Sequence, residues 1–376
     1  MRMIPQIFLL VFILCVLSVK NVTAQARHLF TVEGKIKDGS TLDPLVGVNV
    51  FLNNTTLGSA TDSDGNYEIF NVPVGKYELV ISMVGYEVKK KSITVDKKDL
   101  RGLDYNLSPV SIEIGQIDVY GERDKDWDEQ FRLFQKYFIG TSKNADKCKI
   151  LNKEIIDFKL SDDSKTLTAS ARDRIEILNE ALGYKLYVNL KDFKLNRYGE
   201  TEYLCEAYFQ EMDTTDPVVK WQWEQNRKEA YNGSKRHFLR ALTRQELFNQ
   251  GFRVYNTDYP SWPQLTKFDY VRPWLEDRMD TVSAWERSLK NDDYVKVVYV
   301  GEPEEENYYF YRKEQGSKLN SVQHIQTSWF KLPFGFMSFD TTGNVVNEMV
   351  NMKVFGYWGW QRMADFLPRD YMPGEE

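Results

Sequence analysis

Residues 44–52 read PLVGVNVFL, and residues 61–67 read TDSDGNY. In the first stretch every second residue from 46 to 52 is apolar, which is the period-2 pattern of a strand with one buried face. The second stretch places Gly65 in a turn rich in Asp and Asn, where glycine adopts positive φ at little cost and Asp side chains bond to nearby backbone. Strand and tight turn together form the unit that the neighbouring sequence repeats.

The same unit recurs on both sides of these stretches. Further strand-like runs lie at residues 29–36, 77–83, 92–95 and 103–107, with turns at 37–40, 53–56 and 72–77. About seven short strands at even spacing are typical of an antiparallel β-sandwich. We therefore predict an N-terminal sandwich over residues 28–108.

Five segments of this region, in fixed order, carry a family resemblance. They are VEGKI at 32–36, PLVGVNV at 44–50, TDSDGNY at 61–67, VPVGKY at 72–77 and GY at 85–86. They resemble the carboxypeptidase-regulatory-like domain, which implies a transthyretin-like, or prealbumin-like, sandwich related to immunoglobulin folds. Residues 62–65 place glycine at the fourth position rather than the sixth that a calcium-binding EF-hand loop needs, so we expect no metal there.

The first residues have the pattern of an export signal. Arg2 precedes an apolar run over 4–19, and Val22-Thr23-Ala24 ends it with small residues. A positive start, a short apolar core and a small-x-small exit are typical of a signal peptide, so residues 1–24 are predicted to be one. We expect an exported protein of the periplasm or one associated with the outer membrane.

The charge of the chain limits its partners. The formal net charge is −6, and loss of Arg2 and Lys20 with the signal would change it from −6 to −8. An acidic chain repels phosphate backbones, so we expect no nucleic acid partner. An envelope protein or a glycan remains the expected partner, with the chain peripheral to the outer membrane as one possibility.

Residues 109–125 are predicted to link the sandwich to the rest of the chain. Residues 111–121 alternate like one more strand, and the charged residues 122–125 end that pattern. This segment resembles the junction at which such sandwiches lead into the plug of TonB-dependent outer-membrane transporters.

Residues 126–376 are predicted to form an α+β domain of antiparallel strands with a helical insertion. The expected helices start at Asp126, Asp216, Ser234, Thr243 and Trp358, each from a capping residue, a capping box or helical periodicity. The expected strands are 149–151, 155–160, 166–171, 175–178, 184–190, 202–209, 252–255, 294–300, 307–311, 322–330, 336–339 and 345–354. The chain as a whole is therefore predicted to be mainly β.

This second half also carries a resemblance. The segments are GTSKNA at 140–145, ILN at 150–152, LGY at 182–184, GSKRHFLRAL at 233–242 and GYWGW at 356–360. They resemble exported Bacteroidota proteins that carry a carboxypeptidase-regulatory-like domain. The resemblance implies no particular activity.

The sequence contains no motif that demands catalysis. A zinc carboxypeptidase needs a His-x-x-Glu pair, and none of His28, His237 and His324 has a Glu three residues later. A Gly-x-Ser-x-Gly nucleophile elbow and a phosphate-binding glycine loop are also absent from the sequence. We expect no catalytic residue, no metal and no cofactor.

A cationic stretch is the first candidate for binding. Arg236, Arg240 and Arg244 recur at helical i, i+4 spacing in an otherwise acidic protein, with His237 among them. Guanidinium groups on one face grip carboxylates, phosphates or acidic sugars. The alternative is a solvated helix face with ion pairs to Asp and Glu, and a packed or capping role for His237.

Aromatic residues are the second candidate. Tryptophans at 221, 223, 262, 274, 358 and 360 are many for one domain, and indole faces stack on sugar rings or anchor protein interfaces. Trp262, in Tyr-Pro-Ser-Trp, and Trp358 and Trp360, in Trp-Gly-Trp, are the candidates for exposure. The alternative is that most of these rings are core.

Cys148 and Cys205 are the cysteines left after removal of the signal. In an oxidising compartment they could form one disulfide, and the alternative is two buried thiols.

These observations lead to three functional hypotheses. The first is a non-enzymatic envelope protein whose sandwich docks a protein or glycan partner. The second is an envelope hydrolase acting on peptide or glycan, which would need converging carboxylates or a His–carboxylate pair in a cleft. The third is an accessory subunit of an outer-membrane transporter or assembly machine, by analogy of fold alone.

Overall fold

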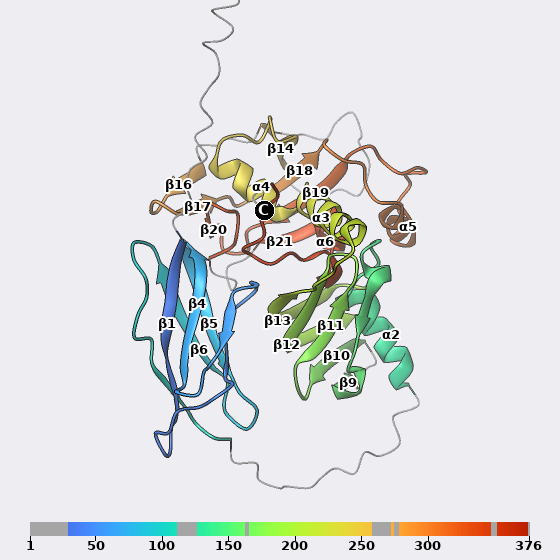
Figure 1. The fold of residues 1–376 in the computed structure, drawn as a ribbon. Helices are drawn as coiled ribbons and strands as arrows, with labels where there is room; N and C mark the ends of the chain where they lie inside the picture. Colours follow the sequence, from blue (N-terminus) through green and yellow to red (C-terminus); the bar gives the residue numbers. More distant parts are fainter. Residues whose placement is uncertain are drawn as a thin grey trace, which may run out of the picture.

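The structure is a computed structural model, and it describes residues 29–110, 126–161, 165–257, 272–273, 278–346 and 352–374. Three parts are visible in Figure 1: the sandwich at lower left (blue), a twisted sheet at lower right (green), and a layer of sheets and helices above both (yellow to red). Within the described residues the molecule is mainly β with several antiparallel sheets and a few helices, as the sequence predicts.

Two sheets form the sandwich. One has the order β4-β1-β7 and the other the order β3-β2-β5-β6. Neighbouring strands are antiparallel apart from β1 and β7, which run parallel. The strands are β1 (Leu29–Asp38), β2 (Asn49–Leu52), β3 (Gly58–Ala60), β4 (Asn66–Pro73), β5 (Gly75–Ser82), β6 (Lys89–Val95) and β7 (Tyr105–Leu107).

The core of the sandwich follows the alternation of the sequence. Val32 and Ile36 from one sheet meet Val50 and Leu79 from the other, all with no exposed surface. The turn before β4 requires glycine, because Gly65 has a φ of +76° and a Cβ there would lie 2.5 Å from the Ile36 carbonyl oxygen.

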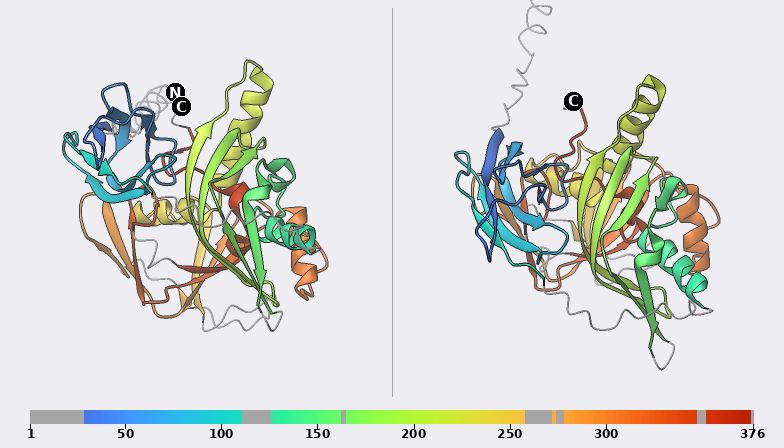
Figure 2. Two further views of the ribbon diagram at one scale, coloured as in Figure 1. Left: turned by 90° about the horizontal axis from the view of Figure 1, so that it is seen from below. Right: turned by 60° about the horizontal axis from the view of Figure 1, so that its bottom comes forward.

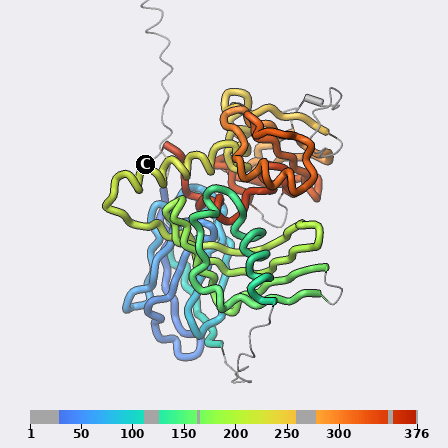
Figure 3. Tube along the Cα trace, turned by 90° about the vertical axis from the view of Figure 1, so that its right-hand side faces the viewer, coloured from blue at the N-terminus to red at the C-terminus, as the bar shows by residue number. Residues whose placement is uncertain are grey.

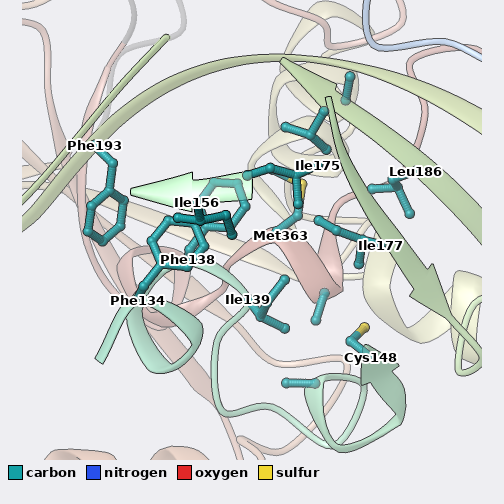
Figure 4. Packing of buried hydrophobic residues seen from close by; sticks show 14 of the residues in the cluster. Phe134, Phe138, Ile139, Cys148, Ile156, Ile175, Ile177, Leu186, Phe193 and Met363 are labelled. Carbon is teal, nitrogen blue, oxygen red and sulfur yellow. The ribbon is translucent and has the colours of Figure 1, made fainter. Parts of the chain in front are cut away.

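The second sheet has the order β8-β11-β12-β10-β9, with β13 paired along β12. Its strands are β8 (Cys148–Ile150), β9 (Ile156–Leu160), β10 (Thr166–Ala171), β11 (Ile175–Asn179), β12 (Tyr184–Asn196) and β13 (Thr201–Glu211). Helix α2 (Trp127–Phe138) covers one face with Phe134 and Phe138, and the Phe134 ring lies 4.8 Å from that of Phe193. Figure 4 shows these rings packed with Ile156 and Met363.

The upper part begins with two helices, α3 (Pro217–Tyr231) and α4 (Lys235–Thr243). Asp216 caps α3 by accepting from Val218 N at 2.8 Å, with Pro217 at the first helical position. Ser234 caps α4 by accepting from His237 N at 3.2 Å.

The rest of the upper part consists of two sheets and two further helices. One sheet has the order β15-β14-β18-β19-β21 and the other β16-β17-β20. The strands are β14 (Phe252–Thr257), β15 (Arg272–Pro273), β16 (Met279–Thr281), β17 (Glu286–Lys290), β18 (Tyr294–Tyr299), β19 (Gln326–Lys331), β20 (Phe336–Asp340) and β21 (Lys353–Gly356), and the helices are α5 (Glu306–Glu314) and α6 (Tyr357–Trp360). Figure 3 shows this part (orange to red) above the strands of the second sheet (green).

Four predicted elements differ from the structure. In the predicted strand 345–354, the described residues are extended in a strand only from Lys353, where β21 begins. Residues 307–311 are part of helix α5 rather than a strand. Its aromatic side chains follow helical spacing, with Tyr308 and Tyr311 packed together against α6. Residues 244–251 form turns rather than a third helix, and the predicted helix at 358–366 is the short α6 followed by a 3-10 turn at Met363–Asp365. The predicted signal peptide and linker strand lie outside the described residues.

The sandwich is fixed to the second sheet through the outer face of β2, β5 and β6. Phe51, Val80 and Lys90 are neighbours across these strands. The Phe51 ring lies 5.2 Å from that of Tyr208 on β13, and Lys90 forms an ion pair with the buried Glu206. Figure 2 shows the two sheets side by side in both views.

The turn at residues 53–56 completes this attachment from two sides. Asn54 N donates to Ala207 O at 2.7 Å, and Phe209 N donates to Thr55 O at 3.0 Å, so the turn adds to the edge of β13. On its other side Arg369 N donates to Asn54 O at 2.7 Å, and the Asp370 carboxylate accepts from Thr56 N at 2.9 Å. The C-terminal segment therefore holds the sandwich as well as the upper part.

Candidate functional site

Arg236 and Arg240 of α4 make contacts inside the molecule. Arg236 Nη1 donates to Pro368 O at 2.6 Å, and its guanidinium lies 5.5 Å from the centre of the Tyr231 ring. Arg240 Nη1 donates to the Tyr231 hydroxyl at 3.3 Å. Arg236 is thus used inside the molecule at the C-terminal segment and Arg240 at α3, and both stay predicted contact residues. Arg244 is exposed at the end of the helix and stays a predicted contact residue.

His237 is a packed residue. Its Nδ1 accepts from Gly233 N at 3.1 Å, and Nε2 lies 3.1 Å from Gln250 Oε1. The Phe252 ring packs on it with a centroid distance of 4.9 Å. Burial lowers the pKa of the imidazole, so it is neutral at pH 7 and positions the start of α4.

Trp358 and Trp360 are buried, and their indole N–H groups are used inside the molecule. Trp358 Nε1 donates to Gly233 O at 2.6 Å, and Trp360 Nε1 donates to Thr141 Oγ1 at 3.0 Å. Neither ring presents an exposed face, which favours the alternative that these rings are core. Trp221, near the start of α3, is 56% exposed. Trp262 lies outside the described residues.

Of the two alternatives for Cys148 and Cys205, the structure has the two free thiols rather than the disulfide. Cys148 lies opposite Asn179 on β11, which lies opposite Tyr184 on β12, which in turn lies opposite Glu211 on β13. Cys205 is six residues away from Glu211 along β13, so the two cysteines are about 20 Å apart along the strands and about 14 Å apart across them. A disulfide requires Cα atoms within about 7 Å.

Three segments that carried the family resemblance of the second half meet at one place, together with the loop before α5, and this place is here called the motif junction. It comprises residues 140–145, the start of α4 at Gly233, the loop 302–305 before α5, and residues 356–365. Trp358 joins 356–365 to Gly233, and Trp360 joins it to Thr141. Residues 182–184 lie near it, because Leu182 N donates to Asn179 Oδ1 and Asn179 Nδ2 donates to Ala364 O.

Asp365 forms the buried floor of the motif junction. Its Oδ1 accepts from Ser142 Oγ at 2.7 Å and from Asn144 Nδ2 at 3.0 Å. Burial raises the pKa of this carboxyl, and the two hydrogen bonds oppose that rise. The adjacent Ala364 is tied to the second sheet, because its carbonyl accepts from Asn179 Nδ2 at 3.0 Å.

Glu305 is the second carboxyl of the motif junction, and its pKa makes it the candidate for acid–base chemistry. Burial raises its pKa to about 7, although Lys143 N donates to its Oε2 at 2.9 Å and lowers the pKa. The negative charge of Asp365 adds to the rise. A glutamate that holds or releases a proton near pH 7 is suited to general acid–base chemistry.

Other charges lie on the outer side of the motif junction. Lys143 forms an ion pair with Glu229, and Glu302 accepts from Asn232 Nδ2 at 2.8 Å. Burial raises the pKa of Glu302 as well. In the ranges that the structure covers, no group of three or more His, Cys, Asp or Glu side chains is arranged to hold a metal ion.

Sequence reasoning missed Glu305 and Asp365, because the chain is rich in carboxylates and no spacing distinguishes these two. The usable signal was the set of resemblance segments, since 140–145 and 356–360 flank both carboxylates in space.

A second candidate surface is the end of the sandwich farthest from the upper part, here called the distal end. It is formed by the loops at 38–47, 61–65, 83–88 and 108–110, and lies at the bottom of Figure 1. Large apolar side chains are exposed there, with Val84 at 87% and Leu42 at 59%, and the set is Leu42, Val46, Val84, Val88 and Val110. An apolar group of this kind marks a surface for interaction.

Hydrogen bonds join the loops of the distal end. Val110 N donates to Gly85 O at 2.8 Å, which places Val110 beside the residue that follows Val84. The Tyr86 hydroxyl donates to Asp38 Oδ2 at 2.6 Å, and Leu42 N donates to Asp38 O at 3.0 Å. The loops are therefore ordered before any partner binds.

Comparison with known proteins agrees with the nature of the sandwich. Residues 32–119 match the family model of the CarboxypepD_reg-like domain. Over that region the chain is similar to a TonB-dependent receptor from Formosa agariphila, with 33% identity over 118 residues. The match covers 31% of this chain, and the chain spans about a tenth of the length of that receptor.

Solved structures share parts of the chain. One is a chain of a type II cohesin–X-dockerin complex from Acetivibrio cellulolyticus, with 27% identity over 22% of this chain and 55% of that chain and a TM-score of 0.18. Another is the minor pilin of Streptococcus agalactiae, with 19% identity over 22% of this chain and 46% of that chain and a TM-score of 0.20. Scores at this level do not establish a common overall fold.

Proposed function

We propose that this protein is a non-enzymatic binding protein of the cell envelope, in which the sandwich docks a protein partner through its distal end. One observation carries the proposal: the distal end exposes a group of apolar side chains. The outer face of β2, β5 and β6 and the turn at 53–56, by contrast, are already used by the rest of the chain. None of this surface is covered by the rest of the described chain, so its burial by a partner lowers the free energy of the complex.

The order of the distal loops supports docking. Fixing flexible loops on binding costs conformational entropy and weakens affinity, and loops that are already ordered reduce that cost. Here Thr61 Oγ1 donates to Leu45 O at 2.6 Å, and the Asp62 carboxylate accepts from Asn66 N at 2.8 Å. The position of the upper part also supports docking through the distal end. The upper part contacts the sandwich at the opposite end, and the distal end points away from the upper part (Figure 1).

Envelope location belongs to the proposal. It rests on the predicted signal at residues 1–24 and on the similarity of the sandwich to part of a TonB-dependent receptor. Among the helices that the structure describes, none is long and apolar enough to cross a membrane. An accessory role beside an outer-membrane transporter or assembly machine is one form that the proposed docking could take.

The test is co-purification from gently solubilised envelope, with mass spectrometry of what accompanies a tagged chain. The natural chain is compared with Val84→Ser/Val110→Ser and with a control, Phe310→Ser, which changes an exposed aromatic residue on α5. We expect a stoichiometric protein partner with the natural chain and the control, and its loss from the distal variant. Equal recovery by all three chains, or a natural chain without partner, would count against the proposal.

A second function, hydrolysis of a peptide or glycan, is favoured by Glu305, because burial raises its pKa to about 7 and a glutamate that exchanges a proton near neutral pH is suited to general acid–base catalysis. The test is turnover of peptidoglycan fragments and peptides by the natural chain and by Glu305→Gln. Turnover that follows the ionisation of Glu305 and disappears in the variant would establish the hydrolase. No turnover by either chain would count against the hydrolase.

A further inference from the structure

The apolar group of the distal end is surrounded by acidic side chains. Asp43 follows Leu42, Glu87 precedes Val88, and Asp62 and Asp64 occupy the neighbouring turn, all exposed. Three lysines border the same end, and one of them, Lys35, lies close enough to Asp62 to lower the pKa of that carboxyl. Lys37 is half-buried, and Lys89 donates to Asn106 O at 3.1 Å along the sandwich's own sheet. Negative charge therefore dominates around the apolar group.

Two acids of the distal end, Asp62 and Asp38, have a lowered pKa and keep their charge. Hydrogen bonds from Asn66 lower the pKa of Asp62, and the hydrogen bond from Tyr86 lowers the pKa of Asp38. Their positions are fixed, because Asp62 accepts from Asp64 N at 2.9 Å and Asp38 accepts from Ser40 N at 2.7 Å. Fixed charges beside an apolar group select a partner by sign as well as by shape.

We propose that the partner of the distal end is a protein surface with apolar side chains bordered by Lys or Arg. This inference rests on the proposed docking function and adds the chemistry of the partner. Apolar contact supplies the affinity, and the acidic border supplies selection and a faster approach of a basic surface. The same border repels an anionic lipid surface, so a membrane is the disfavoured occupant.

The first part of the experiment records which molecule meets the distal end. A photo-crosslinking amino acid replaces Ser40, whose exposed side chain lies between Asp38 and Leu42. The full chain is irradiated in native envelope, and the adduct is sequenced by mass spectrometry. We expect an adduct on a polypeptide segment that contains apolar residues next to Lys or Arg. An adduct on lipid, or on an acidic segment, would overturn the inference.

The second part separates the acidic border from the apolar group. The border variant is Asp43→Lys/Asp64→Lys/Glu87→Lys, which leaves the turn-forming Asp62 and Asp38 in place. Its control is Asp128→Lys/Asp146→Lys/Glu306→Lys, with the same change of charge on exposed residues of the second half. We expect the border variant to lower the adduct yield about tenfold. The control should keep the natural yield, and the yield from the natural chain should fall in about 0.5 M salt.

The outcomes distinguish docking through the distal end from the basic character of the partner. If Val84→Ser/Val110→Ser abolishes the adduct and the border variant does not, docking stands and the basic partner is wrong. If neither variant changes the adduct, the distal end is not the docking surface and both proposals fail. Thermal unfolding of each variant, with a transition like that of the natural chain, shows that loss of the adduct is not loss of the fold.

Discussion

The sandwich and the second half of the chain bury different kinds of side chain. Among the described residues of the sandwich, the core is apolar, and Asp38 at its distal end is the charged residue with little exposure. The second half buries charged side chains at Glu206, Arg227, Lys296, Glu304, Arg312, Asp340 and Asp365. Buried charges persist only when they are paired or hydrogen-bonded. One region is thus specified by alternation of apolar residues and the other by individual long-range polar contacts.

Arg312 gives the largest expected effect. Its guanidinium forms an ion pair with Glu304 and donates to Ser317 Oγ at 3.0 Å, and both charged side chains are almost fully buried. Arg312→Met should lower the free energy of unfolding by about 3–5 kcal/mol, because Glu304 would be left buried without its partner. Urea unfolding followed by tryptophan fluorescence measures the change.

The double variant Arg312→Met/Glu304→Leu is the matched control. It should recover most of the loss, since no charge is then left buried. If the single and double variants unfold at the same urea concentration, the pair has no special role, and the contrast between the two regions loses its main support.

Arg369 tests the contact between the regions. Its guanidinium lies 3.6 Å from the buried Asp340 carboxylate, donates to Lys76 O at 3.3 Å and lies over the Tyr77 ring. Arg369→Ala should cost about 1–3 kcal/mol, because these acceptors lose their donor. Amide hydrogen exchange should quicken at residues 53–56, where the sandwich turn is held.

Arg101→Ala is the control for that prediction, since it removes an exposed arginine from the same sandwich. Exchange at 53–56 should not respond to it. Unchanged exchange in Arg369→Ala would show that β13 alone holds the turn.

The same contrast decides what the sequence could predict. In the sandwich each strand is marked by its own alternation and each turn by Gly, Asn or Asp, so β1 and the turn at Gly65 follow from local pattern. The helices α3 and α4 were predicted for the same reason, because Asp216 and Ser234 are local caps. Local signals sufficed wherever structure is determined locally.

The motif junction could not be predicted, because its contacts join residues far apart in the chain. Ser142 and Asp365 are 223 positions apart, and Lys143 and Glu305 are 162 positions apart. Aromatic residues misled for a related reason: residues 307–311 have strand-like composition, but the packing of Tyr308 against Tyr357 and Trp360 favours a helix. Tertiary contacts determined these elements.

The pH dependence of stability sharpens the comparison at the motif junction. The pKa of Glu305 is raised from 4.5 to about 7, so between these values the folded chain holds a proton that the unfolded chain releases. The contribution of Glu305 to the free energy of unfolding is therefore largest below pH 4.5 and is lost as the pH rises to about 7. Urea midpoints at about pH 5.5 and about pH 7.5 measure it.

Glu305→Gln isolates that contribution from those of its neighbours. Asp365 and Glu302 have raised pKa values and change stability in the same direction, whereas His237, with a lowered pKa, changes it in the opposite direction. Between about pH 5.5 and about pH 7.5 the variant should lose less of its free energy of unfolding than the natural chain, because it lacks the ionisation of Glu305. The exposed neighbour Glu306→Gln should leave the profile as it was, and an identical profile for both variants would refute the role of Glu305.

Val84 gives the smallest expected effect, and it tests the distal end directly. Val84→Ala should leave the free energy of unfolding unchanged, because its side chain is 87% exposed and loses no buried contact. Val50→Ala changes the same residue type in the sandwich core, where none of it is exposed, and should cost about 2–3 kcal/mol. If Val84→Ala also destabilised the isolated chain, the distal end would be part of the fold. An unchanged free energy of unfolding in Val84→Ala means that the apolar surface of Val84 contributes nothing to stability and is available to a partner.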